Sequence, residues 1–542
     1  MGESEEQAAS EIQRGSGSIL KSAGTVSMFT VLSRVFGLVR DIFSAFIFGS
    51  SAVWDSFVLA FTIPNLFRRI FGEGALTSAF LPVAVKARRE QGIEKAGDIT
   101  SALVSLVGLL LVSAACVIAL VTGIYLWLSG ASCDSHLTSF LLLVLIFYLP
   151  FICLSAVLQA ALNSVKHFAL PAFAPVLLNL VWITVLGTML WLFPEGSLTA
   201  KAFVLGGAVV TAGMLQFAIQ VPALRKRGIR LRFSTDFGQK EVKAVFRAMI
   251  PVVLALVVMQ INVLVDRLLA KFMIEGTGAV SALFYGNRLI QFPLAVFGIA
   301  VGVAVFPSLR EYAVDRHFTS IWDTVNFGIR ILILIIIPSS VGLIVIGQPV
   351  IDLVFNWGTF SESPEAAWRV YCVVAAYSTG LLFFCFNILL TRTFHSLDNR
   401  VFPARVAALM VLCNIGLNLL FLLCTPLREA GLALSTSITA CVNVVILICG
   451  LVKQYGFGNV NGVLAVSVRS VLAAGLMGSG VLAAVGFGES SLISWGHSLV
   501  GKLLRTGTGV AVGILVYVGV LALLRTPELR LLRTRLKRGK AH

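Results

Sequence analysis

Residues 63–80 read IPNLFRRIFGEGALTSAF, a stretch that is apolar enough to lie in a membrane yet contains Arg68, Arg69 and Glu73. A charged side chain at the bilayer centre costs roughly 2.5–3.5 kcal/mol on insertion scales, so several such side chains are expected to face water. The whole chain has the same character. Of its 542 residues, 58% are hydrophobic and 13% are charged, whereas soluble domains average about 25% charged residues. We therefore expect a polytopic membrane protein.

Long, uniformly apolar runs without the alternation of barrel strands predict transmembrane helices. A bilayer core about 30 Å thick needs about 20 apolar residues per helix, which gives about fourteen spans and an all-α fold. The predicted spans lie near 18–48, 51–87, 100–129, 137–162, 169–193, 199–223, 241–272, 279–307, 325–347, 367–391, 401–424, 429–453, 464–486 and 505–525.

Basic residues gather on alternate connections between these spans. Eight lie between Arg225 and Arg247 and seven lie from Arg525 onward, whereas residues 130–136 contain no Lys or Arg. Because cytoplasmic connections carry the excess of Lys and Arg, both termini are predicted to be cytoplasmic. Topology and contact with anionic lipid then account for the net charge of +16, without nucleic acid as a partner.

A weak internal repeat suggests the domain organisation. Polar residues interrupt spans one and two and again spans seven and eight, and residues 79–90 and 304–315 close each pair with an apolar-Pro-basic exit. Such a repeat favours two six-helix lobes around a central cavity, as in many transporters. The predicted parts are a cytoplasmic tail (1–17), an N-lobe (18–223), a basic linker (224–240), a C-lobe (241–453), two further helices (454–525) and a basic cytoplasmic tail (526–542).

The charges within the spans favour an anion-binding cavity. Arg34 and Asp41 are seven residues apart and share a helix face, while Arg40 lies about 120° away. Planar arginine forks can grip a diphosphate bidentately. Snorkelling from a helix end is the alternative for a single residue such as Arg69. The candidate residues are Arg34, Arg40, Arg68 and Arg288, with Asp41, Asp55, Asn65, Glu73 and Asp266 in the same polar spans.

Several motifs carry a family resemblance. They are SRVFGLVRD (33–41), D-x-F-x-x-A-F (55–61), PNLFRRIFGEGA (64–75), FLP (80–82), YGNRLIQFP (285–293) and FPSL (306–309). In this order, along nearly the whole chain, they strongly resemble the MurJ/MviN lipid II flippases of the multidrug/oligosaccharidyl-lipid/polysaccharide exporter superfamily. Fourteen spans is also that family's number.

The resemblance implies translocation of undecaprenyl-diphosphate-linked disaccharide-pentapeptide from the inner to the outer leaflet of the bacterial cytoplasmic membrane, for peptidoglycan assembly. It implies that Arg34, Arg40, Arg68 and Arg288 line the cavity, with Arg40 and Arg288 first at the diphosphate. Asp41, Asp55 and Glu73, beside Asn65, would pair with the arginines or gate the cavity. Asp266 resembles an acid implicated in cation coupling, so sodium, protons or the membrane potential would drive the cycle.

The resemblance also implies a lipid-tail groove formed by residues 454–525. The implied partners are lipid II and membrane lipids, together with cell-wall synthesis or division proteins. The chain departs from the family pattern at Thr62, where members often carry Lys, at Asn287, where they often carry an acid, and at NWGTF (356–360), where a charged E-R-G-A-F is usual. The first two departures alter the charge of the cavity.

Other functions remain open at this stage. A cation-coupled drug exporter of the same fold is expected to have an acidic cavity, and a flippase for another polyprenyl-linked oligosaccharide would share the anion chemistry. An ion channel is a further alternative. An enzyme acting on lipid-linked sugars needs paired carboxylates or a reactive His, but no D-x-D, H-x-H or H-E-x-x-H motif is present, and His395 near Asp398 is the nearest approach. We therefore expect no enzyme, cofactor or metal site.

Overall fold

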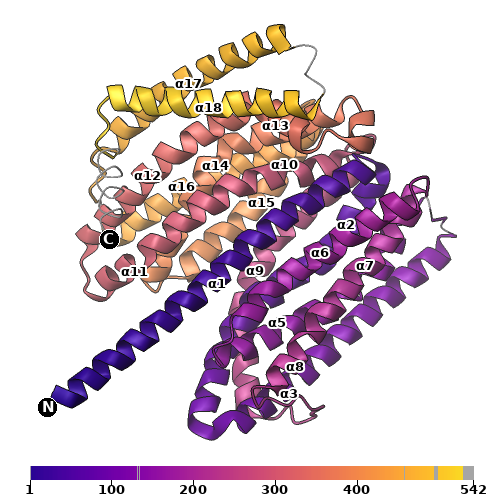
Figure 1. The fold of residues 1–542 in the computed structure, drawn as a ribbon, viewed down its shortest axis with the longest axis vertical. Coiled ribbons are helices and arrows are strands. Elements are labelled where there is room, and N and C mark those ends of the chain that lie inside the picture. The colour runs from indigo at the N-terminus through magenta and orange to yellow at the C-terminus, as the bar shows by residue number, and fades with distance from the viewer. Residues whose placement is uncertain (1, 131, 134, 457, 493–497, 529–542) are drawn as a thin grey trace. The chain divides into compact units, whose positions relative to one another are not determined.

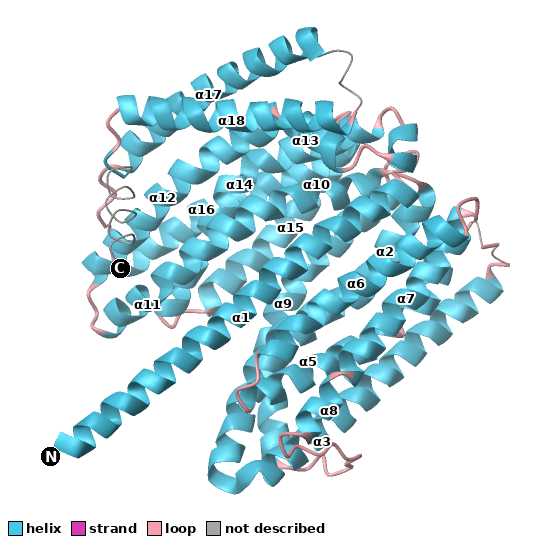
Figure 2. Ribbon diagram, viewed as in Figure 1, coloured by secondary structure: helices cyan, strands magenta, loops and turns pink. Residues whose placement is uncertain are grey.

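The computed structural model describes residues 2–130, 132–133, 135–456, 458–492 and 498–528 (Figure 1). Within these residues the regular elements are all helical, which confirms the predicted all-α fold (Figure 2). The chain divides into two compact units, Met1–Leu264 and Val265–His542. The division falls within one long helix, α9.

The first unit is built from eight α-helices, one π-helix and the greater part of α9. Its elements are α1 (Gly2–Phe48), α2 (Ala52–Phe67), η1 (Arg68–Ala75), α3 (Leu76–Leu128), α4 (Leu137–Leu145), α5 (Tyr148–Ser164), α6 (Ala169–Leu192), α7 (Leu198–Ala218), α8 (Gln220–Arg225) and α9 (Lys240–Phe272).

The second unit begins in the last residues of α9. Its further elements are α10 (Ala279–Pro293), η2 (Leu294–Ile299), α11 (Ala300–Val314), α12 (Phe318–Val345), α13 (Gly347–Val354), η3 (Gly358–Glu362), α14 (Ala366–Ser396), α15 (Val401–Cys424), α16 (Arg428–Tyr455), α17 (Val463–Leu492) and α18 (Leu499–Leu523).

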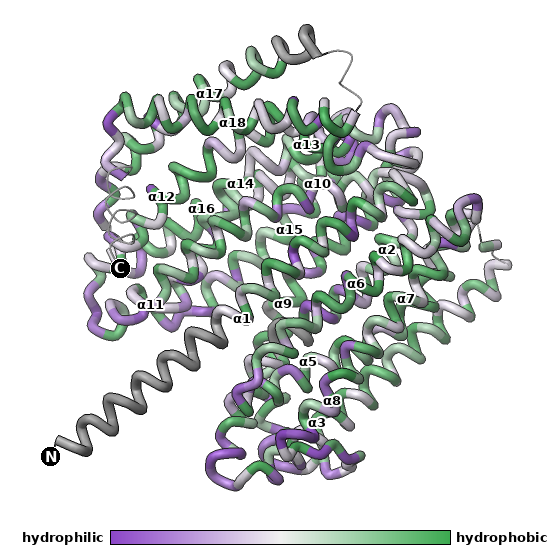
Figure 3. Tube along the Cα trace, in the orientation of Figure 1, coloured by the Kyte–Doolittle hydropathy of each residue, from purple (hydrophilic) through white to green (hydrophobic). Residues whose placement is uncertain are grey.

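Twelve helical runs in the described part of the chain are long and apolar enough to cross a membrane. One of them, Ala52–Leu128, has 77 residues, and Gly92 breaks it with φ 89° and ψ 176°. At about 1.5 Å per residue this run suffices for two crossings. The charged helix α1 is the remaining predicted span. A multi-pass membrane protein is therefore confirmed, and hydrophobic colour follows the helices while hydrophilic colour gathers at many of their ends (Figure 3).

The charged stretch at residues 63–80 forms a widened helix rather than a loop. Ser51 caps α2, because its side chain accepts a hydrogen bond from the Trp54 backbone N–H at 3.2 Å. Pro64 lies inside α2 and has no N–H to donate. Four residues later the helix passes into the π-helix Arg68–Ala75. Single π-helical turns are frequent at functional sites, since they re-aim side chains within a continuous helix.

Aromatic side chains hold α1, α2 and α6 together in the first unit. Phe48 stacks on Trp54 with a centroid separation of 5.1 Å, and Trp54 stacks on Phe57 at 5.3 Å. The ring of Trp182 on α6 meets Phe57 and Phe61 edge-on, at 5.6 Å from each. Such edge and stacked pairs contribute about 0.5–1.5 kcal/mol each beyond their buried area. This packing fixes the Trp182 ring beside α1.

Small residues permit close helix packing in the second unit. A Cβ atom on Gly380 of α14 would lie 2.7 Å from the backbone Cα of Ser437 on α16, so no larger residue fits there. Small residues commonly let membrane helices approach in this way. The α17–α18 hairpin packs on α12 through a buried cluster that includes Leu334, Met477 and Tyr517.

Candidate functional site

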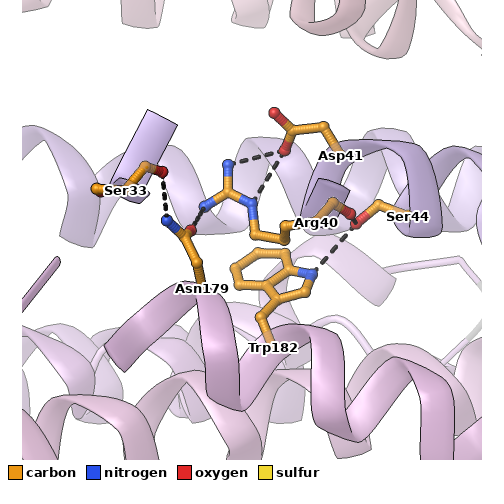
Figure 4. Close-up of polar contacts among 6 residues, drawn as sticks. All are labelled: Ser33, Arg40, Asp41, Ser44, Asn179 and Trp182. Carbon is orange, nitrogen blue, oxygen red and sulfur yellow. Dashed lines mark hydrogen bonds and ion pairs between the residues drawn. The ribbon is translucent and has the colours of Figure 1, made fainter. Parts of the chain in front are cut away.

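Arg40 lies at the centre of a buried polar cluster in the first unit (Figure 4). Its side chain is 11% exposed and that of Asp41 is 1% exposed. The guanidinium donates to Asp41 Oδ1 from Nη2 at 2.8 Å and from Nε at 3.0 Å. It also donates from Nη1 to Asn179 Oδ1 of α6 at 3.2 Å. The residue that pairs with Asp41 is thus its sequence neighbour, whereas Arg34, which shares a face with Asp41 by spacing, is exposed.

An aromatic face completes the surroundings of Arg40. Its Cζ atom lies 4.8 Å from the centroid of the Trp182 ring, within the range of a cation–π interaction. Trp182 Nε1 donates to Ser44 Oγ at 3.2 Å, and Ser44 Oγ donates to the Arg40 carbonyl at 2.8 Å. The guanidinium is therefore oriented by a carboxylate, an amide and a ring together.

The other candidates of the first unit occupy α2 and η1. Arg68 Nε donates to Asn65 Oδ1 at 2.9 Å, which joins two residues of the predicted set. Asp55 is buried in the first turn of α2, where a carboxylate is favoured by the helix dipole. Glu73 lies in η1, and its side chain is outside the described part of the structure.

Asp266 is the buried acid of the second unit. Its side chain accepts a hydrogen bond from Asn418 Nδ2 of α15 at 2.6 Å, and the residue is 8% exposed. Asn418 Nδ2 also donates to Asn414 Oδ1 at 3.0 Å. Ser435 Oγ of α16 donates to Asn418 Oδ1, and Asn414 Nδ2 donates to Ser435 Oγ at 3.2 Å. The acid is thus held at one end of a buried network of amides and hydroxyls.

This network contains oxygen atoms of the kinds that act as ligands of hard cations. Carboxylate, amide carbonyl and hydroxyl oxygens suit alkali and alkaline-earth ions, whereas softer metals prefer His and Cys. The described residues contain no group of three or more His, Cys, Asp or Glu side chains arranged for a metal ion. The residues around Asp266 therefore fit a hard cation or a proton rather than a transition metal.

Arg288 belongs to α10, in the second unit, apart in the chain from the three arginines of the first unit. Its Cζ atom lies 6.0 Å from the centroid of the Phe284 ring. On the same helix, Gln291 Nε2 donates to Asn287 Oδ1 at 2.8 Å, so Asn287 is engaged in a neutral contact where the family often carries an acid. One cavity lined by all four arginines stays a prediction.

Sequence reasoning missed Asn179, Trp182, Asn414 and Asn418. The first two lie within the predicted span 169–193, and the last two lie within 401–424, and by hydropathy both are ordinary apolar spans. A signal was present, because Asn414 and Asn418 are one helical turn apart and must share a face. Two polar residues at that spacing in an apolar helix indicate a buried partner.

The one enzyme-like pair is occupied by other contacts. Asp398 Oδ1 pairs with Arg310 Nη1 at 2.8 Å, and both side chains are largely solvent-exposed. Arg310 Nη1 also donates to the Ser396 carbonyl at 2.8 Å. These contacts join α11 to the end of α14 and engage the Asp398 carboxylate in an ion pair.

Known proteins resemble this chain along most of its length. The family model described as lipid II flippase MurJ matches residues 44–496. The probable lipid II flippase MurJ of Vibrio cholerae is 33% identical over 521 residues, covering 93% of this chain and 96% of that protein. The lipid II flippase MurJ of Burkholderia cenocepacia is 33% identical over 444 residues, covering 79% and 83%.

Two solved structures show the same fold. A lipid II flippase MurJ in an inward closed conformation matches with a TM-score of 0.74 and 24% identity, covering 93% of this chain and 99% of that one. An inward-facing multidrug resistance MATE family transporter matches with a TM-score of 0.62 and 14% identity, covering 81% and 96%. At these identities the structures support the architecture, and the sequence relatives support the family.

Proposed function

The chain belongs to the lipid II flippase MurJ family, and from this premise we propose that it moves lipid II from the inner to the outer leaflet of the bacterial cytoplasmic membrane. The observation that carries the proposal is the buried, oriented guanidinium of Arg40. A charged pair within a membrane span is costly and points to a task, and the diphosphate of a lipid is an anion that can take the place of the Asp41 carboxylate at Arg40. The substrate is undecaprenyl-diphosphate-linked disaccharide-pentapeptide, and no covalent chemistry is involved.

The proposed mechanism is alternating access. Arg34, Arg40, Arg68 and Arg288 hold the diphosphate in a central cavity, and the two units rearrange so that the cavity opens to one leaflet at a time. In the absence of substrate, Asp41, Asp55 and Glu73 compensate the arginines, and Asn65 orients Arg68 through the hydrogen bond described above. The polyprenyl tail stays in lipid, guided by a groove on the α17–α18 hairpin.

Asp266 is proposed as the coupling residue. The oxygens of Asp266, Asn414 and Asn418, with the Ser435 hydroxyl, would hold a sodium ion, or Asp266 would carry a proton. The membrane potential adds a further drive, since one charge moved across 100 mV is worth about 2.3 kcal/mol. If lipid II flipping in vesicles is indifferent to sodium gradient, pH gradient and potential, this coupling is wrong.

The proposed setting follows the family. We place the protein in the inner membrane with both termini in the cytoplasm, among membrane lipids and with cell-wall synthesis or division proteins as neighbours. The MATE-like fold leaves a drug exporter as the second candidate. The proposed set of four arginines favours an anionic cargo over a cationic drug, and Arg40 is the member whose guanidinium is held largely buried.

The test is rescue of a strain depleted of its lipid II flippase. We expect rescue by the wild type and by Arg316→Ala, an exposed control in the α11–α12 connection, but not by Arg40→Ala or Arg288→Ala. Rescue by both Arg40→Ala and Arg288→Ala would contradict the proposal that these arginines bind the diphosphate. If the purified wild type does not flip lipid II in proteoliposomes, although a thermal melting curve shows that it is folded, the proposed function is wrong.

A further inference from the structure

The side chain of Arg40 adopts an arrangement that helix geometry alone does not give. Consecutive residues leave a helix about 100° apart, so Arg40 and Asp41 start in different directions. The arginine nevertheless reaches the carboxylate through two hydrogen bonds, at 2.8 and 3.0 Å. Two residues outside α1 contribute to this orientation. They are Asn179 and Trp182, and both belong to α6 (Figure 4).

Asn179 is locked in one orientation between two turns of α1. Its Nδ2 donates to the Ser33 carbonyl at 3.0 Å, and because a carbonyl can only accept, Oδ1 must face Arg40. The acceptor for the guanidinium is therefore preset by the backbone of α1 itself. Asn179 is buried, so this arrangement is formed on folding.

Trp182 supplies the plane on which the guanidinium lies. The ring is fixed by edge contacts with Phe57 and Phe61 on one side and by its hydrogen bond to Ser44 on the other. Ser44 in turn donates to the Arg40 carbonyl. The ring thus keeps its register with the arginine even if the carboxylate contact is exchanged.

We propose that Asn179 and Trp182 are positioning residues that hold Arg40 ready for the diphosphate of the lipid, while the Asp41 carboxylate occupies the anion's place in the unloaded protein. The proposal rests on the function proposed above. Arginine has many rotamers, and an arginine oriented before binding loses less freedom when an anion arrives. The effect is therefore expected in substrate affinity rather than in folding alone.

The test is a double-mutant cycle on binding of lipid II to the purified, full-length protein in detergent. We expect Asn179→Leu to weaken binding about tenfold, as for loss of one charge-assisted hydrogen bond, and to have no further effect in an Arg40→Gln background. Equal weakening in both backgrounds, or none in either, would overturn the proposal. Wild type that binds no lipid II would instead refute the function on which it rests.

Trp182 gives an independent readout with a matched control. Trp182→Leu should raise the lipid concentration for half-maximal flipping in proteoliposomes by about tenfold, in line with a desolvated cation–π contact, and Trp182→Phe should recover most of the loss. Trp191→Leu, at the exposed end of the same helix, should change nothing. If Trp182→Leu lowers only the maximal rate, or if Trp182→Phe is as defective, the ring does not position Arg40.

Discussion

Each of the two units buries a polar cluster, and the two clusters differ in composition. The first unit surrounds a guanidinium, that of Arg40, with a carboxylate, an amide and an indole ring. The second unit surrounds a carboxylate, that of Asp266, with amides and hydroxyls, and the neighbouring Arg267 also acts on it electrostatically. The first cluster is therefore built around an ion pair, and the second around a carboxylate that accepts a hydrogen bond from an amide.

The largest effect is expected from removing the cation of the first cluster. Arg40→Met removes the ion pair between Arg40 and the buried Asp41 carboxylate; breaking a buried pair costs about 3–5 kcal/mol of folding free energy, and we expect flipping to fall at least a hundredfold. In Arg40→Met/Asp41→Leu the stability should return, because the pair is replaced by apolar side chains, while flipping should not. Thermal melting and proteoliposome flipping measure the two quantities. Recovery of flipping in the double variant would make the cluster purely structural.

The second prediction concerns Asp266, the buried acid of the second unit. Asp266→Asn keeps the size of the side chain and removes its negative charge, so the dependence of flipping on a sodium or proton gradient should disappear. The rate in the presence of the gradient should fall roughly tenfold, since coupling energies are typically about 1–3 kcal/mol. Asp323→Asn, an exposed acid of the same unit, is the control and should retain full ion dependence. Retained dependence in Asp266→Asn would exclude this acid from coupling.

The sequence could predict the features that depend on a single helix, but not the contacts between helices. Hydropathy located the helices well, for example 401–424 to the residue, because span length follows bilayer thickness. Candidate charges such as Arg40 and Asp266 stood out because charge in an apolar span is rare. Asn179, Trp182 and Asn418 did not stand out, since their roles depend on which helix lies opposite. Spacing along one helix likewise could not show that Arg40, rather than Arg34, reaches Asp41.

A third, smaller effect concerns a polar contact without charge in the second unit. Pro338 within α12 cannot donate to the carbonyl of Leu334, four residues earlier. The hydroxyl of Tyr517 on α18 donates to that carbonyl at 2.7 Å and so replaces the missing helical hydrogen bond. Tyr517→Phe should lower stability by about 1 kcal/mol, the size of such bonds in membranes.

The proline provides the control for this prediction. In Pro338→Ala the backbone N–H can satisfy Leu334, so Tyr517→Phe should cost little in that background. Thermal melting of the four proteins gives the coupling directly. An equal loss with and without the proline would mean that Tyr517 stabilises the hairpin by packing alone.

The smallest expected effect concerns a histidine in the connection between α5 and α6 of the first unit. Arg227 Nη2 donates to His167 Nδ1 at 2.7 Å. Partial burial, and then the positive charge of Arg227, lower the pKa of His167 below its usual 6.5. The folded protein therefore binds this proton less readily than the unfolded chain does, so the contribution to stability is complete above pH 6.5 and declines as the pH falls below it.

Melting temperatures across pH 7.5 to 5 should therefore fall more for the wild type than for His167→Gln, which cannot be protonated. Arg227→Gln should reduce the difference, because it removes the repelling charge and leaves only the burial. Identical pH profiles for the wild type and His167→Gln would show that the contact carries no such linkage.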